Sequence, residues 1–115
     1  MAYTQKFQNM ANAARARVDE VSPEHVDGLM AKGAVALDIR DKEEHDVDHI
    51  PGSLNISRGK LEMMVEGEIP DSDTLILCYC NAINRGVLAA DSLRAMGYGN
   101  AKFILGGLIA YRSLG

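Results

Sequence analysis

The chain has 115 residues, 47% of them hydrophobic and 24% charged, which gives room for one domain with a single core. Its net charge of −4 at pH 7 and its pI near 5.3 argue against a nucleic-acid-binding protein, which needs a basic face. The longest apolar run, residues 103–111, contains two glycines and is too short for a membrane span, which takes about 20 residues.

The remaining composition also excludes several kinds of site. Arg15 and Arg17 lie in a polar, alanine-rich N-terminal stretch without the apolar core of a signal sequence, so we expect a cytoplasmic protein. Cys78 and Cys80 are separated by one residue and are too close for an unstrained disulfide. The three histidines form no ligand spacing with these cysteines, so we expect neither a metal nor a cofactor.

Residues 1–17 are predicted to form an amphipathic helical arm ahead of a main domain at residues 18–115. Apolar side chains recur at helical spacing along one stripe of this arm: Tyr3, Phe7, Met10 and Ala14. Such a helix either covers its own domain or meets a partner, and the periodicity favours the first.

Strand-forming and helix-forming segments alternate after the arm. Buried strands are predicted at residues 34–39, 53–56, 75–80 and 101–105, preceded by a short extended piece at residues 17–21. Helices are predicted at residues 23–33, 41–48, 59–68, 86–96 and 107–111, the first of them started by Ser22 and Pro23. The alternation predicts a mostly parallel α/β sheet with helices on both faces.

The carboxyl ends of the strands are where such sheets place their ligands. Asp38, Cys80 and Gly106 all fall at strand ends, so the topology predicts a site among them. Cys78 lies inside its strand and is read as a core residue.

The segment around Cys80 predicts chemistry. An apolar strand ends on this cysteine, a short loop follows, and Arg85 stands where a helix begins. That arrangement aims backbone N–H groups of the loop and helix start at the sulfur, and together with the guanidinium it favours thiolate over thiol. A cation at a helix N-terminus is otherwise unfavourable, which indicates a role for Arg85 beside the thiolate.

Three stretches in this order resemble a single-domain rhodanese, a sulfurtransferase domain, from about Val18 onward. They are residues 37–40 with Glu44 and the turn 49–52, the loop 80–85, and the turn 105–107. The resemblance implies a rhodanese-like fold with a five-stranded, mostly parallel sheet. It also implies that Cys80 takes a sulfane sulfur from thiosulfate or another small-molecule or protein donor, holds it as a persulfide, and passes it to a nucleophilic acceptor.

The resemblance assigns roles around Cys80. Arg85 supplies fixed charge and braces the loop. The substrate-binding residues are expected in the loop and after the third strand: Asn81, Ala82, Ile83, Asn84, Gly86 and Arg58. For Arg58 a solvated side chain is an equal alternative to attraction of an anionic donor. Four residues are read as structural groups near the site, Arg40 and Glu44 being spaced to pair with each other: Asp38, Arg40, Glu44 and His49.

The loop departs from the family pattern in ways that leave alternatives open. Ile83 stands where glycine is frequent, so either the loop takes another path or Ile83 narrows the pocket. Gly86 replaces a common Ser or Thr. Asp48 replaces a glycine, a milder change because Asp tolerates left-handed backbone.

Two other functions therefore stand beside sulfur transfer. One is a catalytically weak or inactive protein-binding module, with the arm as the partner contact. The other is a cysteine-dependent phosphatase or arsenate reductase, which the loop length disfavours: four residues separate Cys80 from Arg85, whereas related phosphatases carry five. The sequence predicts no nucleic-acid or membrane partner, and it predicts neither an oligomeric state nor a pathway.

Overall fold

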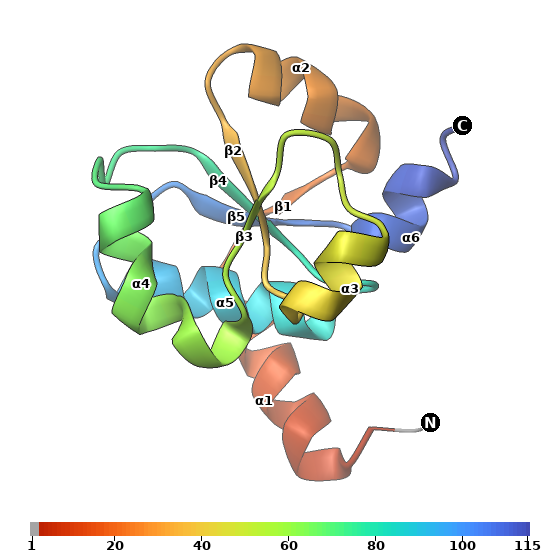
Figure 1. Cartoon of the computed structure of the whole chain (residues 1–115). Coiled ribbons are helices and arrows are strands. Elements are labelled where there is room, and N and C mark those ends of the chain that lie inside the picture. Colours follow the sequence, from red (N-terminus) through yellow and green to blue (C-terminus); the bar gives the residue numbers. More distant parts are fainter. Residues whose placement is uncertain (1–2) are drawn as a thin grey trace.

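A computed structural model describes residues 3–115 as a five-stranded parallel sheet in the order β1-β5-β4-β2-β3 (Figure 1). The strands are β1 (Glu20–Val21), β2 (Val35–Asp38), β3 (Leu54–Asn55), β4 (Ile76–Tyr79) and β5 (Ala101–Ile104). All four strand pairs are parallel, so the predicted fold class is confirmed.

Helices connect the strands and cover both faces of the sheet. They are α1 (Gln5–Arg15), α2 (Val26–Ala31), α3 (Lys42–Val47), α4 (Leu61–Glu68), α5 (Asn84–Ala95) and α6 (Gly107–Arg112), with 3₁₀ turns η1 (Pro23–His25) and η2 (Arg58–Lys60). In the part of the chain that the structure describes, no helix is long and apolar enough to cross a membrane.

The core forms two clusters, one on each face of the sheet, because successive side chains of a strand point to opposite faces. In β4, Ile76 and Cys78 join the cluster beneath α1, α4 and α5, whereas Leu77 and Tyr79 join the cluster beneath α2 and α6. This central strand is buried on both sides, as its continuous apolar sequence predicts.

Helix α1 packs against α5, so the arm covers its own domain (Figure 1). The predicted stripe is wrong in detail: Met10 is 55% exposed, and Tyr3 precedes the helix and is 59% exposed. The buried residues of α1 are Ala11 and Ala14. Because these side chains are small, the backbone of α1 can lie close to α5.

The register of the sheet brings two predicted strand ends together. Asp38, the last residue of β2, pairs with Tyr79, the last residue of β4. The N–H of Ile39 extends the ladder by donating to the Tyr79 carbonyl (3.1 Å). The connections that follow β2 and β4, which carry Arg40 and Cys80, therefore leave the sheet side by side.

Candidate active site

The loop after β4 is held in place by the start of α6. The N–H of Leu108 donates to the carbonyl of Cys80 (2.9 Å), and the N–H of Ile109 donates to the carbonyl of Asn81 (3.1 Å). Cys80 itself is 4% exposed. The helix start thus occupies the first two carbonyls of the loop and fixes the backbone around the cysteine.

Two glycines make this close approach possible. Gly106 and Gly107 have φ values of +77° and +59°, which L side chains rarely adopt. A Cβ on Gly107 would lie 2.4 Å from the Cys80 carbonyl oxygen and 2.6 Å from that of Ala82. The closing turn predicted from residues 105–107 therefore packs directly against the backbone of the cysteine loop.

The backbone N–H groups of the loop have no hydrogen-bond partner among the described residues. Within residues 3–115, the structure gives no hydrogen-bond acceptor to the backbone N–H groups of residues 81–86. The next N–H, that of Val87, already donates to the Ile83 carbonyl (3.0 Å). Unoccupied N–H groups beside a cysteine and a helix N-terminus form the kind of concavity that binds anions.

Ile83 resolves one of the alternatives left open by the sequence. Its φ is −128°, and none of the non-glycine residues from 3 to 115 has a positive φ. The loop therefore follows a path that does not require glycine at this position. Its partly buried side chain packs against the core cluster that includes Cys80.

Gly86 has a packing role at the start of α5. A Cβ there would lie 3.3 Å from the Tyr79 Cα, tighter than ordinary van der Waals contact, and 3.4 Å from the Cys78 carbonyl oxygen, at the limit of ordinary contact. The missing hydroxyl of a Ser or Thr is thus accompanied by a close contact between α5 and β4.

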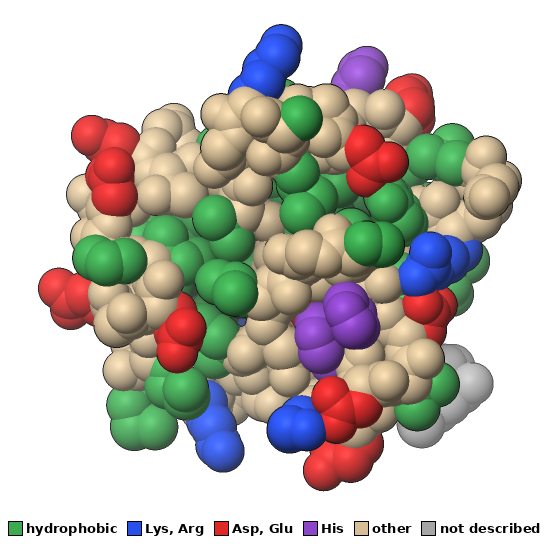
Figure 2. Space-filling view, turned by 45° about the horizontal axis from the view of Figure 1, so that its top comes forward, with side chains coloured by type: hydrophobic (Ala, Val, Ile, Leu, Met, Phe, Trp, Pro, Cys, Tyr) green, Lys and Arg blue, Asp and Glu red, His purple; other side chains and the backbone are tan. Residues whose placement is uncertain are grey.

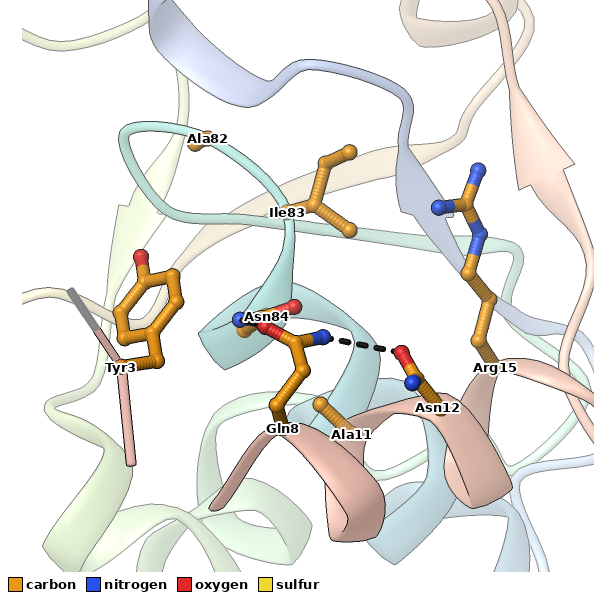
Figure 3. Close-up of a pocket in the computed structure, with 8 residues that line it drawn as sticks. All are labelled: Tyr3, Gln8, Ala11, Asn12, Arg15, Ala82, Ile83 and Asn84. Carbon is orange, nitrogen blue, oxygen red and sulfur yellow. Dashed lines mark hydrogen bonds between the residues drawn. The ribbon is translucent and has the colours of Figure 1, made fainter. Parts of the chain in front are cut away.

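A cavity of about 270 Å³ lies between α1 and the outer side of the loop (Figure 3). Helix α1 contributes Gln8, Asn12 and Arg15, and the loop contributes Ala82, Ile83 and Asn84. The Asn84 amide donates to Gln8 Oε1 (3.2 Å) and so joins the loop to the arm. No local pattern predicts that arm residues meet this loop, because the contact depends on how α1 crosses α5.

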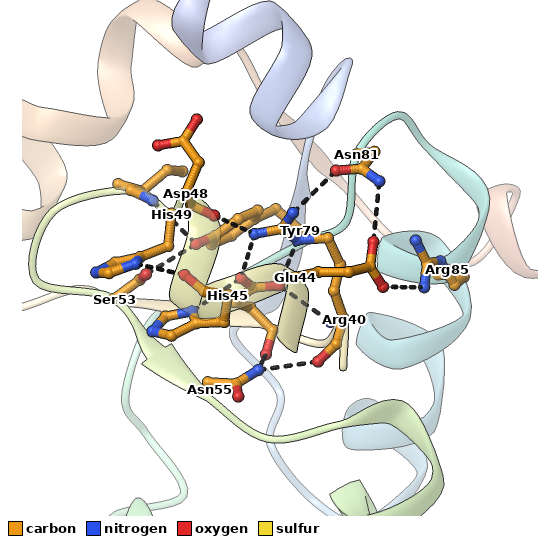
Figure 4. Close-up of polar contacts among 12 residues, drawn as sticks. Arg40, Glu44, His45, Asp48, His49, Ser53, Asn55, Tyr79, Asn81 and Arg85 are labelled. Atoms are coloured by element: carbon orange, nitrogen blue, oxygen red, sulfur yellow. Dashed lines mark hydrogen bonds and ion pairs between the residues drawn. The ribbon is translucent and has the colours of Figure 1, made fainter. Parts of the chain in front are cut away.

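Glu44 connects α3 to the loop and to α5 (Figure 4). Its carboxylate lies 3.5 Å from Arg85 Nη1 and accepts from Asn81 Nδ2 (3.2 Å). Partial burial raises the pKa of Glu44, but the hydrogen bonds from Arg85 and Asn81 outweigh it and hold the pKa below its ordinary value. Arg85, predicted to stand beside the thiolate, is thereby held by a carboxylate at the edge of the loop.

Arg40 pairs with Asp38 and not with Glu44, so the predicted Arg40–Glu44 pair is wrong. Nε and Nη2 of Arg40 donate to the two Asp38 oxygens (3.0 and 2.7 Å), and Nη1 donates to Asn81 Oδ1 (3.1 Å). The expected helical spacing does not apply, because Arg40 lies in the connection between β2 and α3. Asp38 and Arg40 still lie near the loop, joined to it through the Asn81 side chain.

The Asp38 carboxylate is fully buried and remains favoured as an anion. Burial alone raises its pKa, but hydrogen bonds from Arg40 and His45 together outweigh burial and leave the pKa below its ordinary value. His45 Nδ1 lies 2.9 Å from Asp38 Oδ2. A buried Tyr79 hydroxyl completes this region by accepting from the Ile50 N–H (3.1 Å).

His45 and Tyr79 are two residues near the site that local patterns do not predict. A tyrosine at the end of a buried strand was an available signal, because its hydroxyl needs a partner. His49, read as structural, bonds the His45 carbonyl through Nδ1 (2.8 Å). The two histidine rings stack with centroids 3.9 Å apart, and two neighbouring histidines are visible in purple in Figure 2.

Two further predictions concern residues outside the loop. Arg58 donates to Glu62 (2.8 Å), which also accepts from Ser92 Oγ (2.6 Å), so Arg58 takes part in a contact between α4 and α5. Asp48 has φ −160° and ψ 139°, so the left-handed backbone considered for it is wrong. It is extended and pairs with Arg112 of α6.

Fold and loop together define the class. The chain is a parallel α/β protein in which a cysteine follows a central strand, precedes a loop whose backbone N–H groups have no acceptor among the described residues, and is separated by four residues from an arginine. It matches the model of the Rhodanese-like domain over residues 22–114, and it belongs to this family.

Individual relatives agree with this assignment. The chain is 33% identical to thiosulfate sulfurtransferase GlpE of Pseudomonas entomophila over 93 residues, which cover 81% of this chain and 84% of that protein. The structure of the human single-domain sulfurtransferase TSTD1 is similar with a TM-score of 0.71 and 26% identity, covering 84% of this chain and 96% of that one. These similarities confirm the predicted family and support a rhodanese-type sulfurtransferase.

A third similarity extends through the arm. The structure of RPA3614 from Rhodopseudomonas palustris, a protein of unknown function named as a possible tyrosine phosphatase, covers 99% of this chain with a TM-score of 0.86 and 27% identity. This chain covers 94% of that protein.

Proposed function

We propose that this protein transfers sulfane sulfur through a persulfide on Cys80. In the first half-reaction the Cys80 thiolate attacks the outer sulfur of thiosulfate. An S–S bond forms to Cys80, the bond inside thiosulfate breaks, and sulfite leaves with the electron pair. In the second half-reaction a nucleophile such as cyanide takes the outer sulfur and returns the electron pair to Cys80 as thiolate.

The observation that carries this proposal is the group of free N–H groups at residues 81–86 beside Cys80. Both the thiolate and the persulfide are anions, and both gain from oriented N–H dipoles in a site that largely excludes water. Arg85 contributes positive charge from the first turn of α5. Glu44 accepts hydrogen bonds from Arg85 and from Asn81, and so restrains both the guanidinium and the loop. Substrate contacts therefore come chiefly from the backbone of residues 81–86.

The other functions remain specific alternatives. A binding module would use the same fold without persulfide chemistry. A phosphatase is the function named, as possible, for RPA3614, and four residues between Cys80 and Arg85 enclose a narrower ring than the five of phosphatases. We also propose that the protein is cytoplasmic. Its chain would divide into an arm at residues 1–17 and a domain at residues 18–115.

Intact mass after incubation with thiosulfate tests the proposal. We expect the reduced protein to gain one sulfur atom, to lose it on addition of cyanide, and to gain none in Cys80→Ser. Cys78→Ala is the matched control and should load normally, because Cys78 is a core residue of β4.

The alternatives give different results. A folded protein that takes no sulfur from thiosulfate or from a small persulfide would favour the binding module. Hydrolysis of an aryl phosphate that requires Cys80, without any sulfur gain, would favour the phosphatase.

A further inference from the structure

We propose that the cavity between α1 and the loop binds the carboxylate end of a small thiol that accepts sulfur from Cys80. This inference rests on the proposed function and names the acceptor class for the same site. It gives α1, which precedes the family match at residues 22–114, a part in substrate selection.

The position of the cavity suits an acceptor. Its inner wall is Ala82 and Ile83, and Ala82 lies two residues beyond Cys80, so their Cα atoms are at most about 7.6 Å apart. Ile83 contacts both regions, since it lines the cavity and packs against the core cluster that contains Cys80 (Figure 3). The cavity is therefore lined by residues of the same loop that carries Cys80, which places a bound acceptor near the proposed persulfide.

The size of the cavity limits the ligand. Its volume of about 270 Å³ lies just below the range of about 300–1,000 Å³ typical of sites for drug-sized molecules. An amino-acid-sized thiol fits this space better than a protein acceptor, whose contacts would lie on an exposed surface.

The polar wall carries amide donors that a ligand can use. Gln8 Nε2 donates to Asn12 Oδ1 (2.8 Å), and Asn84 Nδ2 donates to Gln8 Oε1 (3.2 Å). These bonds leave N–H donors on all three side chains, because each amide nitrogen carries two, and they also leave the Asn84 amide oxygen as an acceptor. Such a wall is suited to an acceptor-only group, and a carboxylate is one.

Arg15 adds the positive charge. Its guanidinium lies over the Phe103 ring (5.7 Å to the centroid), which restrains its position, and Nη2 lies 3.5 Å from Glu20. Both partners of that ion pair are about half exposed, so the pair is weak and a ligand carboxylate can compete with Glu20. Arg15 is the cation among the described residues that line this cavity.

Sulfur transfer to such a thiol balances without another reactant. The acceptor thiolate attacks the outer sulfur of the Cys80 persulfide, a new S–S bond forms on the acceptor, and the bond to Cys80 breaks. The electron pair returns to Cys80 as thiolate, and the product is the persulfide of the small thiol.

A pair of acceptors that differ only in charge tests the carboxylate site. Full-length protein loaded with sulfur from thiosulfate is mixed with N-acetylcysteine or with its neutral amide, and the ratio of the two second-order rate constants is measured. We expect Arg15→Gln to lower the ratio about fivefold, the loss of one half-exposed charge-assisted hydrogen bond. Intrinsic differences between the two thiols cancel when wild type and variant are compared.

Arg17→Gln is the matched control. Arg17 has the same charge and pairs with Asp91 of α5, away from the residues that line the cavity. It should keep the wild-type ratio, and thermal melts of both variants establish that each is folded. An unchanged ratio in Arg15→Gln, with normal sulfur loading, would overturn the inference and leave the proposed function intact.

A binding measurement separates failure of the inference from failure of the proposed function. N-acetylserine, which cannot accept sulfur, should shift the backbone amide signals of Arg15, Ile83 and Asn84 in NMR spectra, and N-acetylserinamide should shift them less. Protein that fails to load sulfur would overturn the proposed function and with it the acceptor assignment. Absence of shifts at these three residues would overturn the cavity as a carboxylate site, whatever the loading result.

Discussion

Cys78 and Cys80 are separated by one residue and lie in different surroundings, one within β4 and the other just after it. Cys78 lies within β4, and its burial in the core raises the pKa of its thiol to about 12. Cys80 comes just after the strand, where the backbone turns away from the ladder and the N–H groups of residues 81–86 have no acceptor within the described chain. The end of the strand therefore separates a core cysteine from the cysteine that we propose as the nucleophile.

Alkylation distinguishes the two cysteines. With iodoacetamide at pH 7.5, we expect Cys80 to be modified and Cys78 to remain a thiol until the protein unfolds, with peptide mass spectrometry as the measurement. Arg85→Gln should slow modification of Cys80 about fivefold, because the charge of a partly exposed side chain such as Arg85 is worth about 1 kcal/mol to a nearby anion.

Arg94→Gln is the control for this experiment. Arg94 lies on the same helix and is similarly exposed, but its nearest carboxylate is Asp19 at 3.9 Å, away from the loop. A rate that falls equally in both variants would contradict a local effect of Arg85 on the thiolate.

The contact between α6 and the cysteine loop is the feature at the scale of elements on which the site most depends. The start of α6 satisfies two loop carbonyls, and the positive φ of Gly106 and Gly107 brings that helix start within hydrogen-bonding distance. The carbonyls of Cys80 and Asn81 are thus bound by another element, whereas the N–H groups of residues 81–86 have no acceptor among the described residues.

Gly107→Ala should disrupt this contact. The new Cβ would meet two carbonyl oxygens at under 3 Å and would also strain a backbone with φ of +59°, so we expect a loss of about 2–3 kcal/mol in the free energy of unfolding. Sulfur loading of Cys80 should fall as well. Urea denaturation and intact mass measure the two effects.

Gly99→Ala provides the comparison for that variant. Nothing lies within 4 Å of a Cβ at Gly99, and its φ is outside the left-handed range, so the change should leave stability within about 0.5 kcal/mol. A Gly107→Ala variant that is as stable and as active as Gly99→Ala would show that the loop does not depend on this approach.

Sequence patterns predicted the elements better than the partners of individual side chains. Apolar runs and glycine positions predict the strands, the cysteine loop and the closing turn, since each of these depends on local residues. Arg40 pairs with Asp38 and not with Glu44 because of the bend between β2 and α3. Asn84 bonds Gln8 because of the way in which α1 crosses α5. Neither geometry is encoded in a local spacing.

At the scale of the whole molecule, one buried ion pair joins segments that are far apart in the chain. Asp38 ends β2, and Arg40 reaches from there to the Asp48 carbonyl after α3 (2.6 Å) and to Asn81 in the loop (3.1 Å). Both partners of the pair are nearly inaccessible to solvent. Removing one charge would leave the other buried without its partner, which usually costs about 3–5 kcal/mol.

The Asp38–Arg40 pair therefore predicts how stability depends on pH. The folded-state pKa of Asp38 lies below its ordinary value, because hydrogen bonds from Arg40 and His45 outweigh the effect of burial. A carboxyl of this kind stabilises the folded protein above its unfolded pKa of about 3.9, and this contribution is lost as the pH falls through the folded value. Asp38→Asn should lower the free energy of unfolding by about 3 kcal/mol at pH 7.

The difference between wild type and Asp38→Asn should then shrink as the pH falls below about 4, because protonation removes the same charge from the wild-type protein. Urea denaturation from pH 7 to pH 2.5 measures this difference. Asp91→Asn is the control: Asp91 pairs with Arg17 at the surface, so its loss should cost less than about 1 kcal/mol at pH 7. A difference for Asp38→Asn that stays constant over this range would mean that its cost arises from altered packing and not from the charge of the carboxylate.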